Sequence, residues 1–456
     1  MMVGRYRWPL ALSGASALLI GALAAMLGSS VGAATGTPSG TSGSFGQSGH
    51  VVLQSNAACV PHGCAEFGGS YAAAMVVRPN GEIVLGGSNN YIGAGGRGDR
   101  PAGALAELEN GGSPDAAFGE GRGVAGAPFA VTQLYELPGG ELLALGSREG
   151  QDAEVAEYSE TGSLNTGFGT SGVLTIATPP GLVEVRREPD GGYVALAGQG
   201  EGKISIARYL SSGAPDTEFG HAGRVQLSLR KYVLPLAFAV LSSGEIAVLG
   251  RTGSSNEDEL SGKLFLAAVG PNGRVNRAFG TRGIAYLPIA DAVGATVAGA
   301  PGGAIVVAAG ADRSGKSRDE ELATMRYTRL GKIERSFGVR DVSRTAFPPA
   351  AEGEHFVGVS PVAITFGNAG ETIVVGERPI LTVDVPQGVG FVAKYTAHGR
   401  DCAFGSRGLI VDGQLGGADA VAAQPSGDIT VAGWSQKAFA ASRYPSDAKP
   451  RGCQGE

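Results

Sequence analysis

The stretch FGHAGRVQL, residues 219–227, recurs in close variants along most of the chain. Each variant begins with a phenylalanine and a glycine and continues into a short apolar run, as in FGTSGVLTI at residues 168–176. Seven copies share this arrangement, and five of them have another glycine four residues after the phenylalanine. We call them Phe-Gly anchors; their phenylalanines are Phe45, Phe118, Phe168, Phe219, Phe279, Phe337 and Phe404. A repeat of this kind indicates an array of similar structural units.

The segments between the anchors predict small antiparallel sheets. Neighbouring anchors are 50 to 73 residues apart, which is the size of a four-stranded propeller blade with loops of varying length. Each segment contains a hairpin such as REPDGGYVALAG at residues 187–198, in which proline fixes one φ angle and glycine accepts a positive one. The third strand of each unit often ends in a tyrosine: Tyr158, Tyr209, Tyr327, Tyr395 and Tyr444.

The order of motifs at the two ends of the repeat region predicts a closed ring. Seven hairpins accompany seven anchors, but the region begins with an anchor and ends with a third strand, FAASRY at residues 439–444. The strand at His50–Leu53 can therefore complete the last unit and remove the exposed edges of a linear array. We expect an all-β, seven-bladed β-propeller with four-stranded antiparallel blades, formed by residues 45–456 as one domain.

The motifs resemble the delta-60 repeat, a bacterial repeat of exported and cell-surface proteins that is expected to form propeller blades. The resemblance is carried by REPDGGYVALAG, SIARYLSSG and DTEFGHAGRV, and it covers roughly residues 45 to 444. It implies a propeller architecture and an exported setting, and it brings no agreed catalytic residues. The sixth anchor departs from the pattern, because Asp341 replaces the second glycine. We therefore expect an irregular outer strand there.

The N-terminal segment reads as an export signal. Arg5 and Arg7 precede an apolar stretch from Pro9 to Leu27, and cleavage near Ala33 would leave residues 34–44 as a short flexible linker. A retained anchor is the alternative, because the apolar stretch is long for a signal peptide. We expect residues 1–33 to be a signal peptide and the protein to be a secreted or cell-surface monomer. The net charge of −6 argues against a nucleic-acid partner.

The four cysteines suggest disulfides, as their even number in an exported chain favours. Cys59 and Cys64 are close enough to close a small loop, and we expect them to pair. Cys402 lies just before the last anchor, and Cys453 lies after the last strand. We expect those two to form a second disulfide near the junction of the chain ends.

The sequence gives few signs of catalytic chemistry. The five histidines fall at unrelated positions of different units, and no phosphate-binding loop, dinucleotide fingerprint or nucleophile elbow occurs. No cofactor is expected. Polar residues of the innermost strands are the candidates for a channel: Gln133, Glu184, Arg186, Thr365 and Asp419. A glycoside hydrolase needs two facing carboxylates, and Glu184 with Asp419 could supply them only across a narrow channel.

The insertions gather on one face of the predicted ring, where binding usually occurs. Two insertions are acidic, and we expect the binding residues to be Glu257, Asp258, Asp319 and Glu320. Calcium is a weaker alternative, because the spacing of these carboxylates matches no calcium loop. We predict a secreted, non-catalytic binding or scaffold module that presents this face to a glycan, a cell-envelope component or a protein. The alternative is a propeller enzyme, a hydrolase or lyase, with its site at the channel mouth.

Overall fold

The computed structural model describes residues 44–53, 67–91, 102–121, 123–148, 152–198, 202–229, 232–253, 262–290, 292, 294–312, 320–338, 341–349, 355–356, 358–381, 387–435 and 438–446. Everything below refers to these residues. The predicted signal peptide, Cys59, Cys64, Cys453, Glu257, Asp258 and Asp319 lie outside them. In the described part of the chain, no helix is long and apolar enough to cross a membrane.

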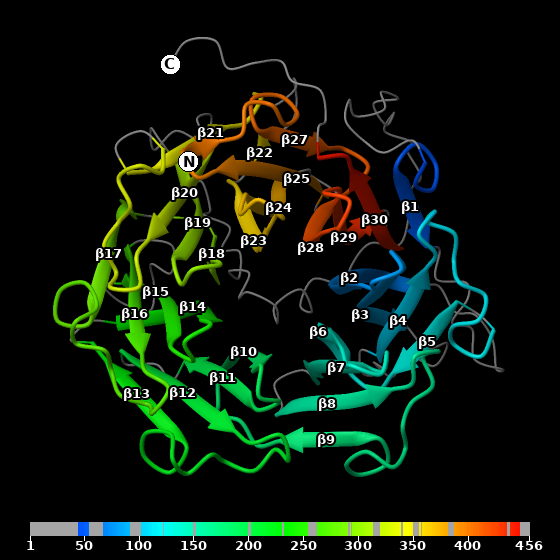
Figure 1. The fold of residues 1–456 in the computed structure, drawn as a ribbon, viewed down its shortest axis with the longest axis horizontal. Helices are drawn as coiled ribbons and strands as arrows, with labels where there is room; N and C mark the ends of the chain where they lie inside the picture. Colours follow the sequence, from blue (N-terminus) through cyan, green and yellow to red (C-terminus); the bar gives the residue numbers. More distant parts are fainter. Residues whose placement is uncertain are drawn as a thin grey trace, which may run out of the picture.

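The protein is a seven-bladed β-propeller, as the repeat predicts. Seven small antiparallel sheets surround a central axis, and the first strand of each hairpin lies innermost (Figure 1). Blade 1 contains β2 (Phe67–Val77), β3 (Ile83–Tyr91), β4 (Ala102–Leu108) and β5 (Val124–Ala127). Blade 2 contains β6 (Ala130–Glu136), β7 (Leu142–Ser147), β8 (Ala153–Tyr158) and β9 (Val173–Ile176). Blade 3 contains β10 (Leu182–Arg187), β11 (Tyr193–Gly198), β12 (Lys203–Tyr209) and β13 (Arg224–Ser228).

The other four blades repeat this order. Blade 4 contains β14 (Tyr232–Val240), β15 (Ile246–Gly253), β16 (Lys263–Val269) and β17 (Ile284–Ala290). Blade 5 contains β18 (Ala295–Gly299), β19 (Ile305–Asp312), β20 (Glu320–Tyr327) and β21 (Ser343–Ala346). Blade 6 contains β23 (Ser360–Phe366), β24 (Thr372–Leu381), β25 (Gln387–Thr396) and β27 (Leu409–Asp412), with the short β22 (His355–Phe356) and β26 (Gly399–Arg400) added. Blade 7 contains β28 (Gly417–Ala423), β29 (Ile429–Ser435), β30 (Ala438–Tyr444) and β1 (His50–Leu53).

Blade 7 closes the ring with both ends of the repeat region, which confirms the prediction. Strand β1 pairs antiparallel with β30, so that Val51 lies opposite Ala441 and Leu53 opposite Phe439 (Figure 1). Side chains reinforce the backbone pairing, because His50 Nδ1 lies 2.8 Å from Ser442 Oγ. The N-terminal strand thus supplies the outer edge of the last blade as its fourth strand.

The Phe-Gly anchors join each blade to the next. Six of the seven anchor phenylalanines are buried and Phe168 is partly exposed, and in five anchors the glycine N–H donates to a carbonyl of the following blade. Gly119 donates to Thr161 over 2.9 Å, and Gly280 donates to Leu330 over 2.7 Å. The repeated motif therefore has a packing role, which explains why it occurs in every blade.

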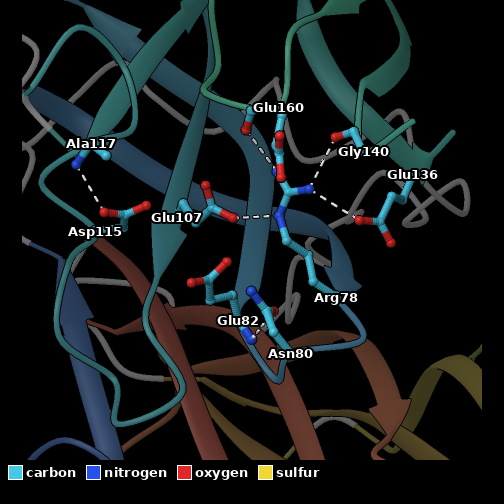
Figure 2. Close-up of polar contacts among 9 residues, drawn as sticks. All are labelled: Arg78, Asn80, Glu82, Glu107, Asp115, Ala117, Glu136, Gly140 and Glu160. Carbon is cyan, nitrogen blue, oxygen red and sulfur yellow. Dashed lines mark hydrogen bonds and ion pairs between the residues drawn. The ribbon is translucent and has the colours of Figure 1, made fainter. Parts of the chain in front are cut away.

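Basic side chains provide a second set of links between blades. Arg208 of blade 3 donates to the carbonyl of Pro271 in blade 4, and Arg443 of blade 7 donates to the carbonyl of Asn110 in blade 1. In blade 3 the acidic residue, Glu188, follows the innermost strand and the arginine is on the third strand. In blade 1 the two positions are reversed: Arg78 follows the innermost strand and pairs with Glu107 of β4. Figure 2 shows Arg78 reaching the carbonyls of Gly140 and Glu160 in blade 2, at 3.0 and 2.8 Å.

The sixth anchor does not disturb its blade, so the expected irregular outer strand is wrong. Strand β21 has four residues and pairs regularly with β20. Asp341 adopts a φ of 76°, close to the 84° to 94° of the glycines at this place in five other anchors, such as Gly223 and Gly283. A short polar side chain tolerates the left-handed conformation better than most residues do.

Candidate functional site

The ring has two unlike ends. One end carries the hairpin turns, and we call it the turn face. The other end, which we call the loop face, carries the connections from the second to the third strand of a blade and from each blade to the next. In six of the seven innermost strands the pairing register shifts at an equivalent place, near the loop face. Asp419 is the residue skipped by this shift in β28, between Ala418 and Ala420.

Asp419 lies close to a second carboxyl group, Glu377 of β24, in the neighbouring blade. Glu377 follows Gly376 and stands opposite Gly390 in the sheet of blade 6. A Cβ placed on Gly417, two residues before Asp419, would lie only 3.0 Å from Glu377 Oε2. The side chain of Glu377 thus crosses from blade 6 to the first residue of β28. A glycine there leaves room for it.

Trp434 of β29 approaches the same glycine. The same Cβ on Gly417 would lie 2.5 Å from Trp434 Nε1, and a Cβ on Gly416 would overlap the six-membered ring of Trp434. Tyr71 of β2 completes the group from blade 1, with its ring edge-to-face with Trp434 at a centroid distance of 6.5 Å. We call Glu377, Asp419, Trp434 and Tyr71 the carboxyl site. All four side chains are partly exposed.

Burial dominates the acidity of the two carboxyl groups. Loss of hydration raises the pKa of Glu377 to about 7. Loss of hydration, followed by the charge of Glu377, raises the pKa of Asp419 to about 8. Both groups keep some solvent contact, yet protein surrounds them on most sides. In the described part of the chain, neither carboxyl group forms a hydrogen bond or an ion pair with a basic residue.

Perturbed acids that meet in one place are a recognised mark of a functional site. Near neutral pH this pair holds a proton that two ordinary carboxyl groups would have lost. Such a pair can accept hydrogen bonds with its ionised oxygens and donate one with its protonated oxygen. It can also act as a general acid and its partner base.

Of the other predicted channel residues, the two charged ones pair with each other. Glu184 and Arg186 lie on β10 and form an ion pair, with Arg186 Nη2 2.6 Å from Glu184 Oε1. Gln133 accepts a long hydrogen bond from Tyr135 OH, at 3.4 Å. Thr365 lies on β23 opposite Ile373 and is partly exposed. The charge that acts on Asp419 is therefore that of Glu377, and Glu184 has a basic partner of its own.

Most of the residues predicted in the acidic insertions lie outside the described part of the chain. Of the four residues predicted there, Glu320 alone is described, and it is buried at the start of β20. Arg378 Nη2 lies 3.2 Å from its carboxylate, so Glu320 helps to join blades 5 and 6. Glu321 is similarly paired with Arg344 at 3.0 Å. Among the described residues, no group of three or more histidine, cysteine or acidic side chains is placed to hold a metal ion.

A hollow of about 750 Å³ lies on the turn face between blades 4 and 5. In blade 4, Ala268 stands at the position that Arg208 occupies in blade 3. Four of the five charged side chains of the hollow form ion pairs, Arg326 with Glu334 at 3.1 Å and Arg329 with Glu245 at 3.6 Å, and Lys332 is the fifth. The carboxyl site has unpaired acids instead, and we regard it as the better candidate.

Sequence reasoning found Asp419 but missed Glu377, Trp434 and Tyr71. Asp419 could be found from the sequence because it is a charged residue within an apolar innermost strand. Glu377 follows a strand-ending glycine beside an insertion, where an acidic residue is unremarkable. The glycine pair Gly416-Gly417 was the available signal, since adjacent glycines at the start of a strand indicate the close approach of other groups.

Cys402 is disulfide-bonded. Its predicted partner, Cys453, lies outside the described residues, so that pairing stays a prediction.

No family model matches the chain, and no curated protein matches it either. Solved structures match at low identity. The β-propeller domain of the Trilobed protease from Pyrococcus furiosus is 5% identical, with a TM-score of 0.39, over 86% of this chain and 97% of that one. A protein of unknown function from Dyadobacter fermentans is 11% identical, with a TM-score of 0.36, over 88% and 98%. An endo-arabinanase from Bacillus licheniformis is 12% identical, with a TM-score of 0.30, over 59% and 94%. These likenesses carry no argument about function.

Proposed function

We propose that the protein is a secreted binding propeller whose ligand is a glycan held at the carboxyl site on the loop face. The observation that supports this most directly is the meeting of two unpaired acids with two aromatic side chains over Gly416 and Gly417. Aromatic rings pack against the C–H faces of sugar rings, and carboxylates accept hydrogen bonds from sugar hydroxyl groups. The proposed binding site is thus the carboxyl site at the mouth of the channel, in place of the acidic insertions expected from the sequence.

The test is a glycan array followed by titration calorimetry with the best ligand. Trp434→Ala should weaken binding about tenfold or more, because it removes the largest apolar surface of the site. Tyr286→Ala is the matched control, since Tyr286 lies on the outer strand β17 and is 54% exposed. An unchanged affinity in a folded Trp434→Ala protein would refute the proposed site. The thermal midpoint of each variant shows whether it is folded.

A second candidate, a glycoside hydrolase, is favoured by one observation: both carboxyl groups have a raised pKa. A glycosidase uses one carboxylic acid that stays protonated near neutral pH and a second that is ionised. Hydrolysis of the bound glycan by the wild type, abolished by Glu377→Gln and by Asp419→Asn, would establish this function. Binding without hydrolysis by the wild type would exclude it for that glycan.

A further inference from the structure

Elsewhere in the described part of the ring, five of the six buried carboxylates pair with an arginine, and the sixth, Asp412, accepts hydrogen bonds from Ser442 and Tyr444 and lies 3.5 Å from His50. Glu107 pairs with Arg78, Glu188 with Arg208, and Glu320 with Arg378. Even Glu184, on the channel side of blade 3, pairs with Arg186. Glu377 and Asp419 are different, because two acids from adjacent blades lie together with no basic side chain paired to either. The carboxyl site thus contains two acidic groups and no paired basic side chain.

The aromatic part of the site also favours a cation. The rings of Tyr71 and Trp434 meet edge-to-face, at 87°, beside the two carboxyl groups. An aromatic face attracts a positive charge through its quadrupole, and indole does so most strongly. The carboxyl groups and the rings come from three successive blades, 6, 7 and 1, on both sides of the ring closure. Acids alone would suit a metal ion, whereas acids beside aromatic rings suit an organic ammonium group.

We propose that the carboxyl site recognises the protonated amino group of an amino sugar, with the ammonium held by Glu377 and Asp419 and the sugar ring beside Trp434. This inference rests on the proposed function, because it names the class of glycan bound at the same site. The ammonium supplies the missing cation and three donors for carboxylate oxygens. An N-acetylated sugar has the same ring but lacks the charge.

Binding of this kind has a proton signature. A cation beside the pair favours the ionised carboxyl groups, so the bound site holds fewer protons than the free site. At about pH 6 the ligand amine is charged and the free site is largely protonated, so binding should release protons, on the order of one per ligand. A neutral sugar would not displace them. The affinity should also pass through a maximum with pH, since the acids must ionise and the amine must stay charged.

The test compares an oligosaccharide of glucosamine with the N-acetylglucosamine oligosaccharide of the same length, by calorimetry at about pH 6 in two buffers of different ionisation enthalpy. We expect the glucosamine form to bind at least about tenfold more tightly and to release protons. Glu377→Gln and Asp419→Asn should each remove that preference and the proton release. Glu218→Gln, which changes an exposed carboxylate beside an anchor, should leave both intact.

The outcomes separate the two proposals. Equal binding of both sugars, abolished by Trp434→Ala, would overturn the amino-sugar inference and leave the proposed glycan site standing. Binding of neither sugar, together with no hit on a glycan array, would overturn both. Tight glucosamine binding that survives in the folded double variant Glu377→Gln/Asp419→Asn would place the amine elsewhere and also refute the inference.

Discussion

The glycine of the Phe-Gly pair is required by the shape of the backbone at the anchor. Gly280 has a φ of 54°, and a Cβ there would overlap the carbonyl oxygen of Ile284, where the outer strand begins. The chain folds back on itself at this point and leaves no space for a side chain. The same overlap recurs at Gly119 with the carbonyl of Val124, so the repeat keeps glycine for a local steric reason.

Gly280→Ala should therefore lower the free energy of unfolding by about 2–3 kcal/mol, through the clash with Ile284 and the left-handed φ angle. Urea denaturation followed by circular dichroism measures the loss. Gly413→Ala is the control, because a Cβ there meets nothing within 4 Å and its φ is not positive. Equal stability of the two variants would contradict the steric explanation.

At the scale of the element, the strand pairing β1–β30 holds the ring together. Val51 is partly buried and packs against the cluster that contains Phe45 and Ala441, whereas Val52 points outward and is 44% exposed. Alternation along a strand places neighbouring residues on opposite faces. The two valines therefore separate the contribution of packing from that of strand propensity.

Val51→Asp should destabilise the protein by roughly 2–4 kcal/mol, because it places an unpaired carboxylate in an apolar contact. Val52→Asp should have little effect. Thermal unfolding measures both variants, and limited proteolysis shows whether residues near 50 become accessible. If Val52→Asp lowered the thermal midpoint as much as Val51→Asp, the assignment of Val51 to the buried side of β1 would be wrong.

The elements of the fold could be predicted from sequence because they repeat. The hairpin turns, the third-strand tyrosines and the closing strand at His50–Leu53 all lie where the repeat places them. Links between blades were less accessible: Arg78 donates to the carbonyl of Glu160, 82 residues away, and this contact depends on how blade 1 packs against blade 2. A periodic pattern predicts what each blade shares, and the carboxyl site consists of residues that the other blades lack.

At the scale of the whole molecule, the carboxyl site couples stability to pH. The ordinary pKa values of Glu377 and Asp419 are 4.5 and 3.8, and folding raises them to about 7 and about 8. At a pH between the ordinary and the raised pKa values, the folded protein therefore binds more protons than the unfolded chain. The free energy of unfolding must fall as the pH rises through this window, because ionisation of the pair is penalised in the folded state.

Glu377→Gln/Asp419→Asn should remove this part of the pH dependence. Relative to the wild type, the double variant should gain stability between about pH 5 and about pH 8.5, as measured by the urea midpoint at both values. The comparison must be a difference, since Glu107, Glu154 and Glu188 also have raised pKa values. A constant difference between the two proteins across this range would show that the acids are not perturbed as described.

Closure of blade 7 makes the beginning of the repeat region depend on its end. Strand β1 is among the first parts of the ring to be synthesised, yet its partner β30 is among the last. A chain that is still being synthesised cannot complete the ring before residue 444 has emerged from the ribosome. Until then, the backbone groups of β1 that pair with β30 have no partner strand. A protein truncated before β30 would keep up to six blades and two unpaired edges, and such edges invite association with other chains.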